Sequence, residues 1–177
     1  GLCGAPWAND GSSEGATNED EHRLLKIVND GWVDHVSKLG SNCVMLNPVF
    51  ESDAHGYDTR DYTKVDARLG TSEDLRAVVD AFHAAGVRVL LDGVFNHVGR
   101  GFWAFQDVLA NRENSPYAGW FNIDWGGDSS YGDGFGSWHS PYRKAYIERW
   151  ARVAGLARFD GIMIDMLFTG PKGGDFS

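Results

Sequence analysis

Three residues that could take part in chemistry follow one apolar run within six positions. The segment Asp92-Gly93-Val94-Phe95-Asn96-His97 supplies an acid, an amide and an imidazole directly after the run at 87–91. Side chains at the end of a buried strand can all line one pocket, although they can also cap the next helix or bind loop backbone groups. Because three such groups stand together, we favour the pocket.

A second acid stands in a similar place further along the chain. Asp165 lies near the end of the apolar run at 159–166, and Asn47 directly follows another run at 43–46. Barrel enzymes of the (β/α)8 type place their chemistry at the C-terminal ends of their strands. Polar groups that collect past each strand therefore favour a barrel over an open doubly wound sheet. Neither of the Gly-rich phosphate-binding motifs occurs in the sequence.

Helical and strand patterns alternate along the chain, which predicts a parallel sheet with right-handed crossovers. Apolar residues at helical spacing precede each short continuous apolar run. The first expected unit is a helix over 25–39, ended by Gly40, with a strand at 43–46. The second is a helix that begins at Thr71 or Ser72 and ends at Gly86, with a strand at 87–91. The third is a helix that begins at Ser140-Pro141, with a strand at 159–166.

The fold class we expect is α/β, a (β/α)8 barrel of which the chain holds about the first half. A complete barrel needs about 250 residues, whereas the chain has 177. We count three strands and a remnant of another near 1–5, which corresponds to strands 1–4. Residues 1–177 then form one partial catalytic barrel domain, with a loop insertion rich in Gly and aromatic residues at about 98–139.

Composition argues against several classes of partner. The net charge is −9 and no block of Lys and Arg occurs, so we expect neither nucleic acid nor an anionic membrane as the main partner. No apolar stretch approaches the roughly 18 residues of a membrane span, and the N-terminus lacks a signal pattern. Cys3 and Cys43 have no metal-ligand spacing. The compartment stays open, with the cytoplasm favoured slightly over secretion.

Longer motifs around these residues resemble the α-amylase family of glycoside hydrolases, and within it the neopullulanase and cyclomaltodextrinase-like branch. The similar segments are DGVFNH at 92–97, GYDTRDY at 56–62, FDGIMID at 159–165, and the stretches at 1–10 and 102–125. Several long matches in the right order are far more specific than one motif. The resemblance implies a catalytic barrel that hydrolyses α-linked glucans with retention.

The resemblance also implies a role for each matching residue. Asp165 corresponds to the nucleophile that forms a covalent glycosyl-enzyme, and retaining hydrolysis needs a second carboxyl group about 5–5.5 Å away. Asp92 corresponds to a residue that contacts the sugar ring, and His97 to one that hydrogen-bonds sugar hydroxyls. Tyr57 corresponds to the platform beneath the sugar. Asn96 corresponds to a residue that ligates calcium in many members, and no other cofactor is implied.

The chain departs from the family pattern in ways that bear on activity. Met163 occupies the position of an arginine that holds the nucleophile ionised, and a guanidinium beside a carboxyl group favours its charged form. The acid/base glutamate of the family belongs on a later strand, whereas only Asp175 is acidic after Asp165. The joint at 132–140 is shorter than we expect in relatives. Whether the chain by itself is an enzyme is therefore left open, since its catalytic set is incomplete.

Three hypotheses remain open at this point. The first is the N-terminal half of a glycosidase acting on α-glucan oligosaccharides or polysaccharides. The second, suggested by Met163 and the missing glutamate, is a non-catalytic relative that binds carbohydrate or a partner protein. The third is a structural half-barrel whose open strand edges pair with the missing half or with a second copy of the chain.

Overall fold

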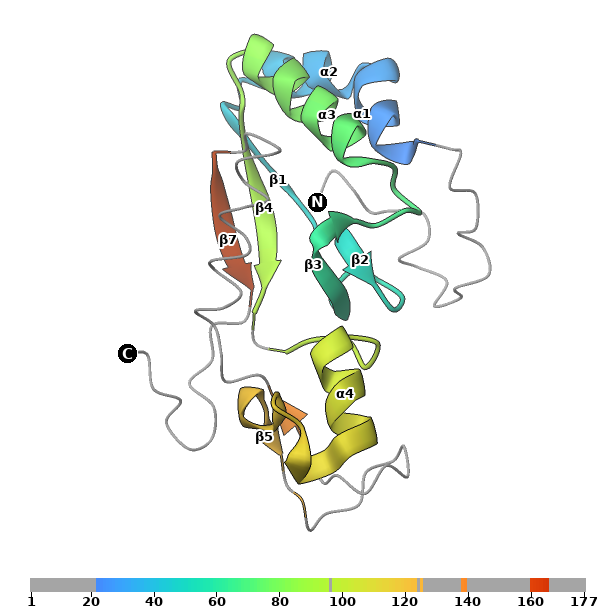
Figure 1. The fold of residues 1–177 in the computed structure, drawn as a ribbon. Helices are drawn as coiled ribbons and strands as arrows, with labels where there is room; N and C mark the ends of the chain where they lie inside the picture. The colour runs from blue at the N-terminus through green and yellow to red at the C-terminus, as the bar shows by residue number, and fades with distance from the viewer. Residues whose placement is uncertain (1–21, 96, 124, 126–137, 140–159, 166–177) are drawn as a thin grey trace.

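A three-stranded parallel sheet forms the centre of the molecule. The computed structural model describes residues 22–95, 97–123, 125, 138–139 and 160–165. The sheet has the order β1 (Cys43–Leu46), β4 (Arg88–Val94), β7 (Gly161–Asp165). In Figure 1 the three arrows run the same way, with α1, α2 and α3 near their beginnings and α4 beyond their ends. The three strands expected from the sequence, and their parallel direction, are confirmed.

The first helix differs from the prediction of one continuous helix over 25–39. A short 3-10 turn, η3 (Arg23–Leu25), leads into α1 (Lys26–Asn29), and a separate helix α2 (Trp32–Lys38) follows. Gly31 lies between them with a φ of 78°, a left-handed conformation that interrupts an α-helix and that glycine adopts without steric cost. Gly40, with a φ of 74°, follows the end of α2 as predicted.

The second helix, α3 (Ser72–Ala84), agrees with its sequence signals. Thr71 is the N-cap: its hydroxyl oxygen accepts a hydrogen bond from the Asp74 N–H, and the Asp74 carboxylate accepts one from the Thr71 N–H. This reciprocal pair satisfies two backbone donors that a helix start leaves free. The apolar face of α3 is buried in the core, and its members are Leu75, Val78, Val79 and Phe82.

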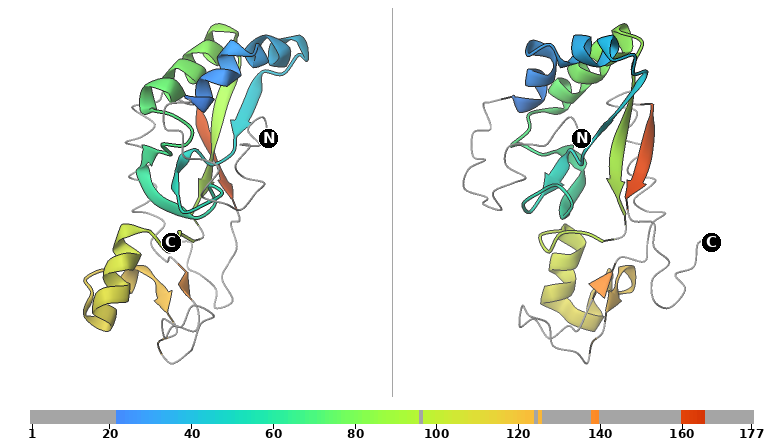
Figure 2. Two further views of the ribbon diagram at one scale, coloured as in Figure 1. Left: turned by 90° about the vertical axis from the view of Figure 1, so that its right-hand side faces the viewer. Right: turned by 180° about the vertical axis from the view of Figure 1, so that it is seen from behind.

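An antiparallel hairpin stands between the first two helix–strand units, and the sequence patterns did not predict it. Its strands are β2 (Phe50–Ser52) and β3 (Thr59–Val65). Figures 1 and 2 show the hairpin beside the C-terminal half of β4. It is short and irregular in register, and alternation over so few residues gives a weak signal.

The segment after β4 contains more regular structure than the loop expected at 98–139. It holds α4 (Trp103–Asn111) and the 3-10 turns η4 (Arg112–Asn114) and η5 (Ala118–Trp120). It also holds the short strand pair β5 (Asn122–Ile123) and β6 (Trp138–His139). A buried stripe of Ala104, Phe105 and Val108 fixes α4. The helix expected to begin at Ser140 and the strand remnant near 1–5 lie outside the described residues.

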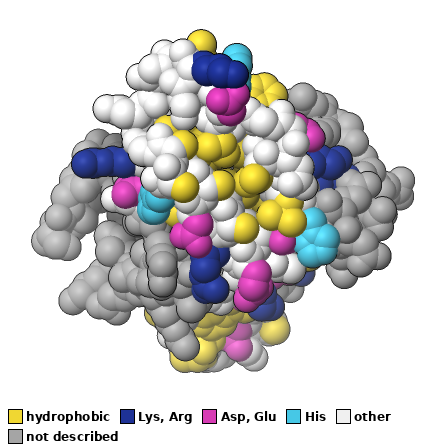
Figure 3. Space-filling model, turned by 90° about the horizontal axis from the view of Figure 1, so that it is seen from above, with side chains coloured by type: hydrophobic (Ala, Val, Ile, Leu, Met, Phe, Trp, Pro, Cys, Tyr) yellow, Lys and Arg dark blue, Asp and Glu magenta, His cyan; other side chains and the backbone are white. Residues whose placement is uncertain are grey.

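Charges of both signs are mixed on the face of the described part that Figure 3 shows. Figure 3 views the molecule from above, where acidic, basic and histidine side chains are interspersed among apolar ones on the described residues. No helix among the described residues is both long enough and apolar enough to span a membrane.

Asp160, just before β7, contacts both β4 and α3. Its backbone N–H donates to the Val89 carbonyl oxygen over 2.8 Å, and its carboxylate accepts the Val89 N–H over 2.7 Å. The same carboxylate oxygen lies 2.6 Å from Nε2 of His83, near the end of α3. The hydrogen bond from Val89, followed by the contact with His83, holds the pKa of Asp160 below its ordinary value despite partial desolvation.

This carboxylate should make the stability of the chain sensitive to acid. A carboxyl group whose pKa is lowered by folding stabilises the native state above its unfolded pKa of about 3.9, and that stabilisation is lost as the pH falls through the folded pKa. We expect Asp160→Asn, whose amide oxygen can still accept from Val89, to lose less stability than the wild type between about pH 6 and pH 3. Urea denaturation across this range is the measurement, and equal losses in both proteins would contradict the prediction.

Candidate active site

Asp92 lies inside a strand, which corrects the expectation that it directly follows one. We expected the strand at 87–91, whereas β4 continues to Val94. The extension occurs because β7 pairs with β4 as far as Val94, which stands opposite Asp165. Asp92 is consequently 3% exposed and buried within the sheet region. A carboxyl group this deeply buried needs polar neighbours, so its position favours a functional or structural network over a solvated loop.

The sheet register brings the predicted strand-end positions to one edge. Asp92 stands opposite Met163, and Asp165 is the last residue of β7, two pairs further along. Leu46 of β1 pairs with Leu91 of β4. Asn47 and Asp92 are the residues that directly follow this pair on the two strands. The backbones of three strands thus carry polar residues to neighbouring positions. Asn96 and the side chains of Met163 and Asp165 lie outside the described part of the structure.

His97 follows this edge and is held there through its backbone by Tyr62. The Tyr62 hydroxyl donates to the carbonyl oxygen of Val94 and lies 3.3 Å from that of His97. The Tyr62 ring is 2% exposed and contacts the rings of Phe95 and Phe102 at centroid distances of 5.8 and 6.1 Å. One residue of β3 therefore fixes the end of β4 and the half-buried His97 together.

Tyr57 lies in the loop that joins β2 to β3. Gly56, just before it, has a φ of 94°, and its N–H donates to the Ser52 hydroxyl over 3.0 Å. The Tyr57 N–H donates to Nδ1 of His55 over 3.3 Å, and the two rings have centroids 6.2 Å apart. The Tyr57 side chain is half-buried. The hairpin thus presents an aromatic ring from a tight turn, and Figure 1 shows the hairpin beside the C-terminal half of β4, the strand that contains Asp92.

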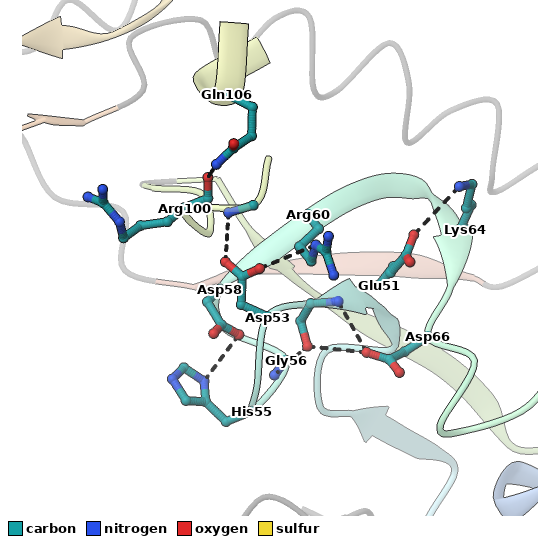
Figure 4. Close-up of polar contacts among 12 residues, drawn as sticks. Glu51, Asp53, His55, Gly56, Asp58, Arg60, Lys64, Asp66, Arg100 and Gln106 are labelled. Atoms are coloured by element: carbon teal, nitrogen blue, oxygen red, sulfur yellow. Dashed lines mark hydrogen bonds and ion pairs between the residues drawn. The ribbon is translucent and has the colours of Figure 1, made fainter. Parts of the chain in front are cut away.

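An ion pair between Asp66 and Arg68 holds the base of the same hairpin, and Figure 4 shows the Asp66 side of this contact. The Asp66 carboxylate accepts hydrogen bonds from the Ser52 N–H at 3.1 Å and the Ser52 hydroxyl at 3.2 Å. Arg68 donates Nε and Nη2 to the two oxygens of Asp66 at 2.8 and 2.6 Å, a bidentate pair. The hydrogen bond with Asp66 raises the pKa of Arg68 against the opposing effect of burial, so the guanidinium stays charged.

Sequence reasoning missed the residues that hold this geometry. Tyr62 stood in a quoted motif, but nothing in its spacing indicated a hydroxyl bound to the end of β4. Asp66 and Arg68 are two positions apart, a spacing that by itself does not reveal a buried pair. The glycine before Tyr57 was the one local signal, since a turn with positive φ favours glycine.

The described residues offer hydrogen-bonding groups and an aromatic surface, but no metal centre. Among residues 22–95, 97–123, 125, 138–139 and 160–165, no group of three His, Cys, Asp or Glu side chains converges as a metal site would require. Asn96 lies outside these residues, so its implied calcium role stays a prediction.

Comparison with known proteins gives the family. The family described as "Alpha amylase, catalytic domain" matches residues 28–151. A cyclomaltodextrinase from a Bacillus species is 50% identical over 92 residues, which are 51% of this chain and 16% of that protein. A cyclomaltodextrinase from Thermoanaerobacter pseudethanolicus is 43% identical over 119 residues, covering 67% of this chain and 20% of that protein.

Solved structures agree with the sequence comparison. A debranching enzyme from Nostoc punctiforme superposes with a TM-score of 0.71 at 34% identity, covering 85% of this chain and 34% of that one. The cyclic α-maltosyl-(1→6)-maltose hydrolase of Arthrobacter globiformis superposes with a TM-score of 0.70 at 32% identity, and the match covers 81% of this chain and 35% of that one.

These neighbours are α-amylase family barrel enzymes, and the parallel sheet and helices of the chain are consistent with the (β/α)8 class predicted from the sequence. The chain spans only 16–20% of the length of the two curated relatives named here. The family match nevertheless covers more than half of the chain. The chain therefore belongs to the α-amylase family of glycoside hydrolases.

Proposed function

We propose that the chain is the N-terminal half of the catalytic barrel of a retaining glycoside hydrolase that acts on α-linked glucans. The observation that carries the proposal is the family match over residues 28–151, joined to the shared edge at the ends of β1, β4 and β7. In this proposal residues 1–177 form one partial barrel domain, and 98–139 are an insertion after β4. The relatives named cyclomaltodextrinase and maltogenic amylase support an α-glucan as the ligand.

Each predicted site residue has a part in the proposed chemistry. Asp165 is the nucleophile that attacks the anomeric carbon, which forms a bond to the carboxylate as the glycosidic bond breaks. Asp92 and His97 hydrogen-bond the sugar held beside it, and Tyr57 lies beneath the ring, since sugars bind to aromatic faces. Support for this division comes from the register pairing of Val94 with Asp165 and from the fastening of His97 by Tyr62.

The catalytic set is incomplete in this chain, so we expect the isolated chain to bind sugar, and we expect turnover only from a longer chain. Retaining hydrolysis needs an acid/base carboxyl group that protonates the leaving oxygen, and after Asp165 the sequence has only Asp175. Met163, opposite Asp92, gives Asp165 no positive charge to favour its ionised form. Calcium bound at Asn96 remains a proposal on which no step depends.

Binding of sugar by the isolated chain is the direct test. We expect maltotriose to bind with a dissociation constant on the order of 1 mM, a free energy of about −4 kcal/mol, and cellotriose, its β-linked counterpart, to bind more weakly. Isothermal calorimetry measures both. His97→Ala should weaken maltotriose binding, because it removes a hydrogen-bonding side chain without touching the core. The absence of heat at millimolar maltotriose would count against a binding role.

Turnover is tested in a longer chain that adds the later strands with their glutamate. We expect hydrolysis of maltooligosaccharides or pullulan, and a faster reaction with Met163→Arg, because the guanidinium would hold the nucleophile charged. Reducing-sugar release measures both rates. Intact glucans in the completed protein, even with Met163→Arg, would contradict the catalytic proposal and leave a non-catalytic sugar-binding relative.

The edges of the sheet suggest the partner that completes the fold. Within the described residues, β1 and β7 are the outer strands of the sheet, and open edges pair readily with other strands. We propose that the second half of the barrel covers them and that, without it, two copies associate there. Sedimentation of the isolated chain should show dimers or larger species, whereas a soluble monomer would contradict the association of copies.

A further inference from the structure

The hairpin that carries Tyr57 meets the segment after His97 at two glycines. A methyl group on Gly99 would overlap the carbonyl oxygen of Asp58, and one on Gly101 would overlap the Asp53 carboxylate. Neither glycine has a positive φ, so a side chain is excluded here by the close approach of the two segments and not by backbone conformation. The turn holding Tyr57 and the loop following β4 are thus in direct contact.

Hydrogen bonds join the two segments at this contact. The Gly99 N–H donates to the Thr59 carbonyl oxygen over 2.8 Å, and the Gly101 N–H donates to Oδ2 of Asp53 over 2.9 Å. The Asp53 N–H closes the turn by donating to the Asp58 carbonyl oxygen over 3.0 Å. Among these bonds, the one from Gly101 is the only one that uses a side chain of the hairpin, and its acceptor is charged.

We propose that Asp53 is a positioning residue, which docks the Tyr57 turn onto Gly99–Gly101 and thereby fixes Tyr57 relative to His97. The Asp53 N–H closes the turn through the Asp58 carbonyl oxygen. The Asp53 carboxylate binds the other segment (Figure 4), so one residue takes part in both contacts. His97 stands two residues before Gly99. The consequence for sugar binding rests on the function proposed above, whereas the docking itself does not.

The ion pair between Asp53 and Arg60 is a competing explanation for the role of Asp53. Nε of Arg60 lies 3.3 Å from Oδ1 of Asp53, but the two side chains are 49% and 31% exposed. Exposed pairs of this kind contribute little to stability. A hydrogen bond from a backbone N–H to a carboxylate is stronger than a neutral one. The docking should therefore depend on the bond to Gly101, and Arg60→Ala is a matched control that leaves this bond in place.

Amide hydrogen exchange of the isotopically labelled chain tests the docking. We expect Asp53→Ala to raise the exchange rate of the Gly101 N–H at least about tenfold, the effect of losing roughly 1.4 kcal/mol, and to raise that of the Tyr57 N–H as well. Asp53→Asn keeps an acceptor oxygen and should restore most of the protection. Arg60→Ala should resemble the wild type, and the amides of β4 should exchange alike in all four proteins.

Two outcomes would overturn the proposal. One is unchanged protection of Gly101 and Tyr57 in Asp53→Ala. The other is equal loss of protection in β4, which would mean that Asp53 stabilises the whole chain and positions nothing in particular.

Maltotriose titration of the same proteins separates this inference from the proposed function. We expect affinity to fall about tenfold in Asp53→Ala and to stay unchanged in Arg60→Ala. Wild-type affinity in Asp53→Ala, together with lost Gly101 protection, would refute the link to the sugar site. If the wild type itself binds no maltotriose, the proposed binding function fails, and the exchange rates still decide whether Asp53 docks the turn.

Discussion

Replacing Asp66 with alanine is expected to lower the free energy of unfolding by about 3–5 kcal/mol, a large part of the stability of a small domain. The Asp66 side chain is 3% exposed and that of Arg68 15%. Removing the carboxylate leaves a largely buried guanidinium with only its hydrogen bonds to Ser52, and it also takes away the acceptor of both Ser52 hydrogen bonds to Asp66. The cost comes mainly from the uncompensated charge, since the intact pair itself contributes much less.

Two control variants separate this effect from a general sensitivity of the hairpin. Ser52→Ala removes the hydrogen bonds of the Ser52 hydroxyl with Asp66, Gly56 and Arg68 but keeps the ion pair, and should cost about 0.5–1.5 kcal/mol for each bond. Glu51→Ala removes a contact 3.7 Å from the exposed amine of Lys64, and should change the free energy of unfolding by less than about 1 kcal/mol. Urea denaturation followed by tryptophan fluorescence ranks the three proteins. An Asp66→Ala loss no larger than that of Ser52→Ala would show that the pair is not the main support of the hairpin.

Substitution of Tyr62 should have the second large effect on the free energy of unfolding. This effect can be divided between the ring and the hydroxyl. Tyr62→Ala is expected to cost about 3–5 kcal/mol, because it leaves a cavity among Phe50, Phe95 and Phe102. Tyr62→Phe keeps the packing and should cost about 1–3 kcal/mol, because the buried carbonyl oxygen of Val94 loses its donor. Equal costs for both variants in urea denaturation would contradict this division.

The Tyr62→Phe variant also bears on the site. Because the hydroxyl also donates to the His97 carbonyl oxygen, its loss should change the NMR signal of the Val98 N–H, which belongs to the same peptide group, and leave those of the β1 amides in place. A change spread evenly over β1 and β4 would indicate that the hydroxyl acts on the whole sheet and does not position His97.

Much of the framework followed from local signals that need no tertiary knowledge. The capping residue Thr71 and the apolar stripe of α3 predicted that helix, because a reciprocal cap and a 3.6-residue period are properties of neighbouring residues. The apolar runs at 43–46 and 87–91 predicted the strands β1 and β4, but the burial on both faces that such runs suggest is incomplete, because Cys43 and Met45 of β1 are only half-buried. The break at Gly31 was missed, because a glycine within a periodic segment is compatible with both a continuous and an interrupted helix.

Long-range contacts account for what local signals could not provide. The extension of β4 to Val94 depends on pairing with β7, whose residues lie far along the chain. The hairpin β2–β3 is held by Asp66, Arg68 and Tyr62 through contacts with other segments rather than by a strong local pattern. Such elements form only when their partners are already near, so propensity alone is a poor guide to them.

The sequence by itself determined the family and the parallel direction of the strands, and it predicted Asp92, His97 and Asp165 as site residues, because these are matters of residue type and spacing. Only the tertiary structure decided how the turn that holds Tyr57 meets the segment after His97, through the contact of two segments at Gly99 and Gly101 with Asp53 as the charged acceptor. The physical reason is that a hydrogen bond across 48 residues depends on distance in space, which residue spacing does not encode.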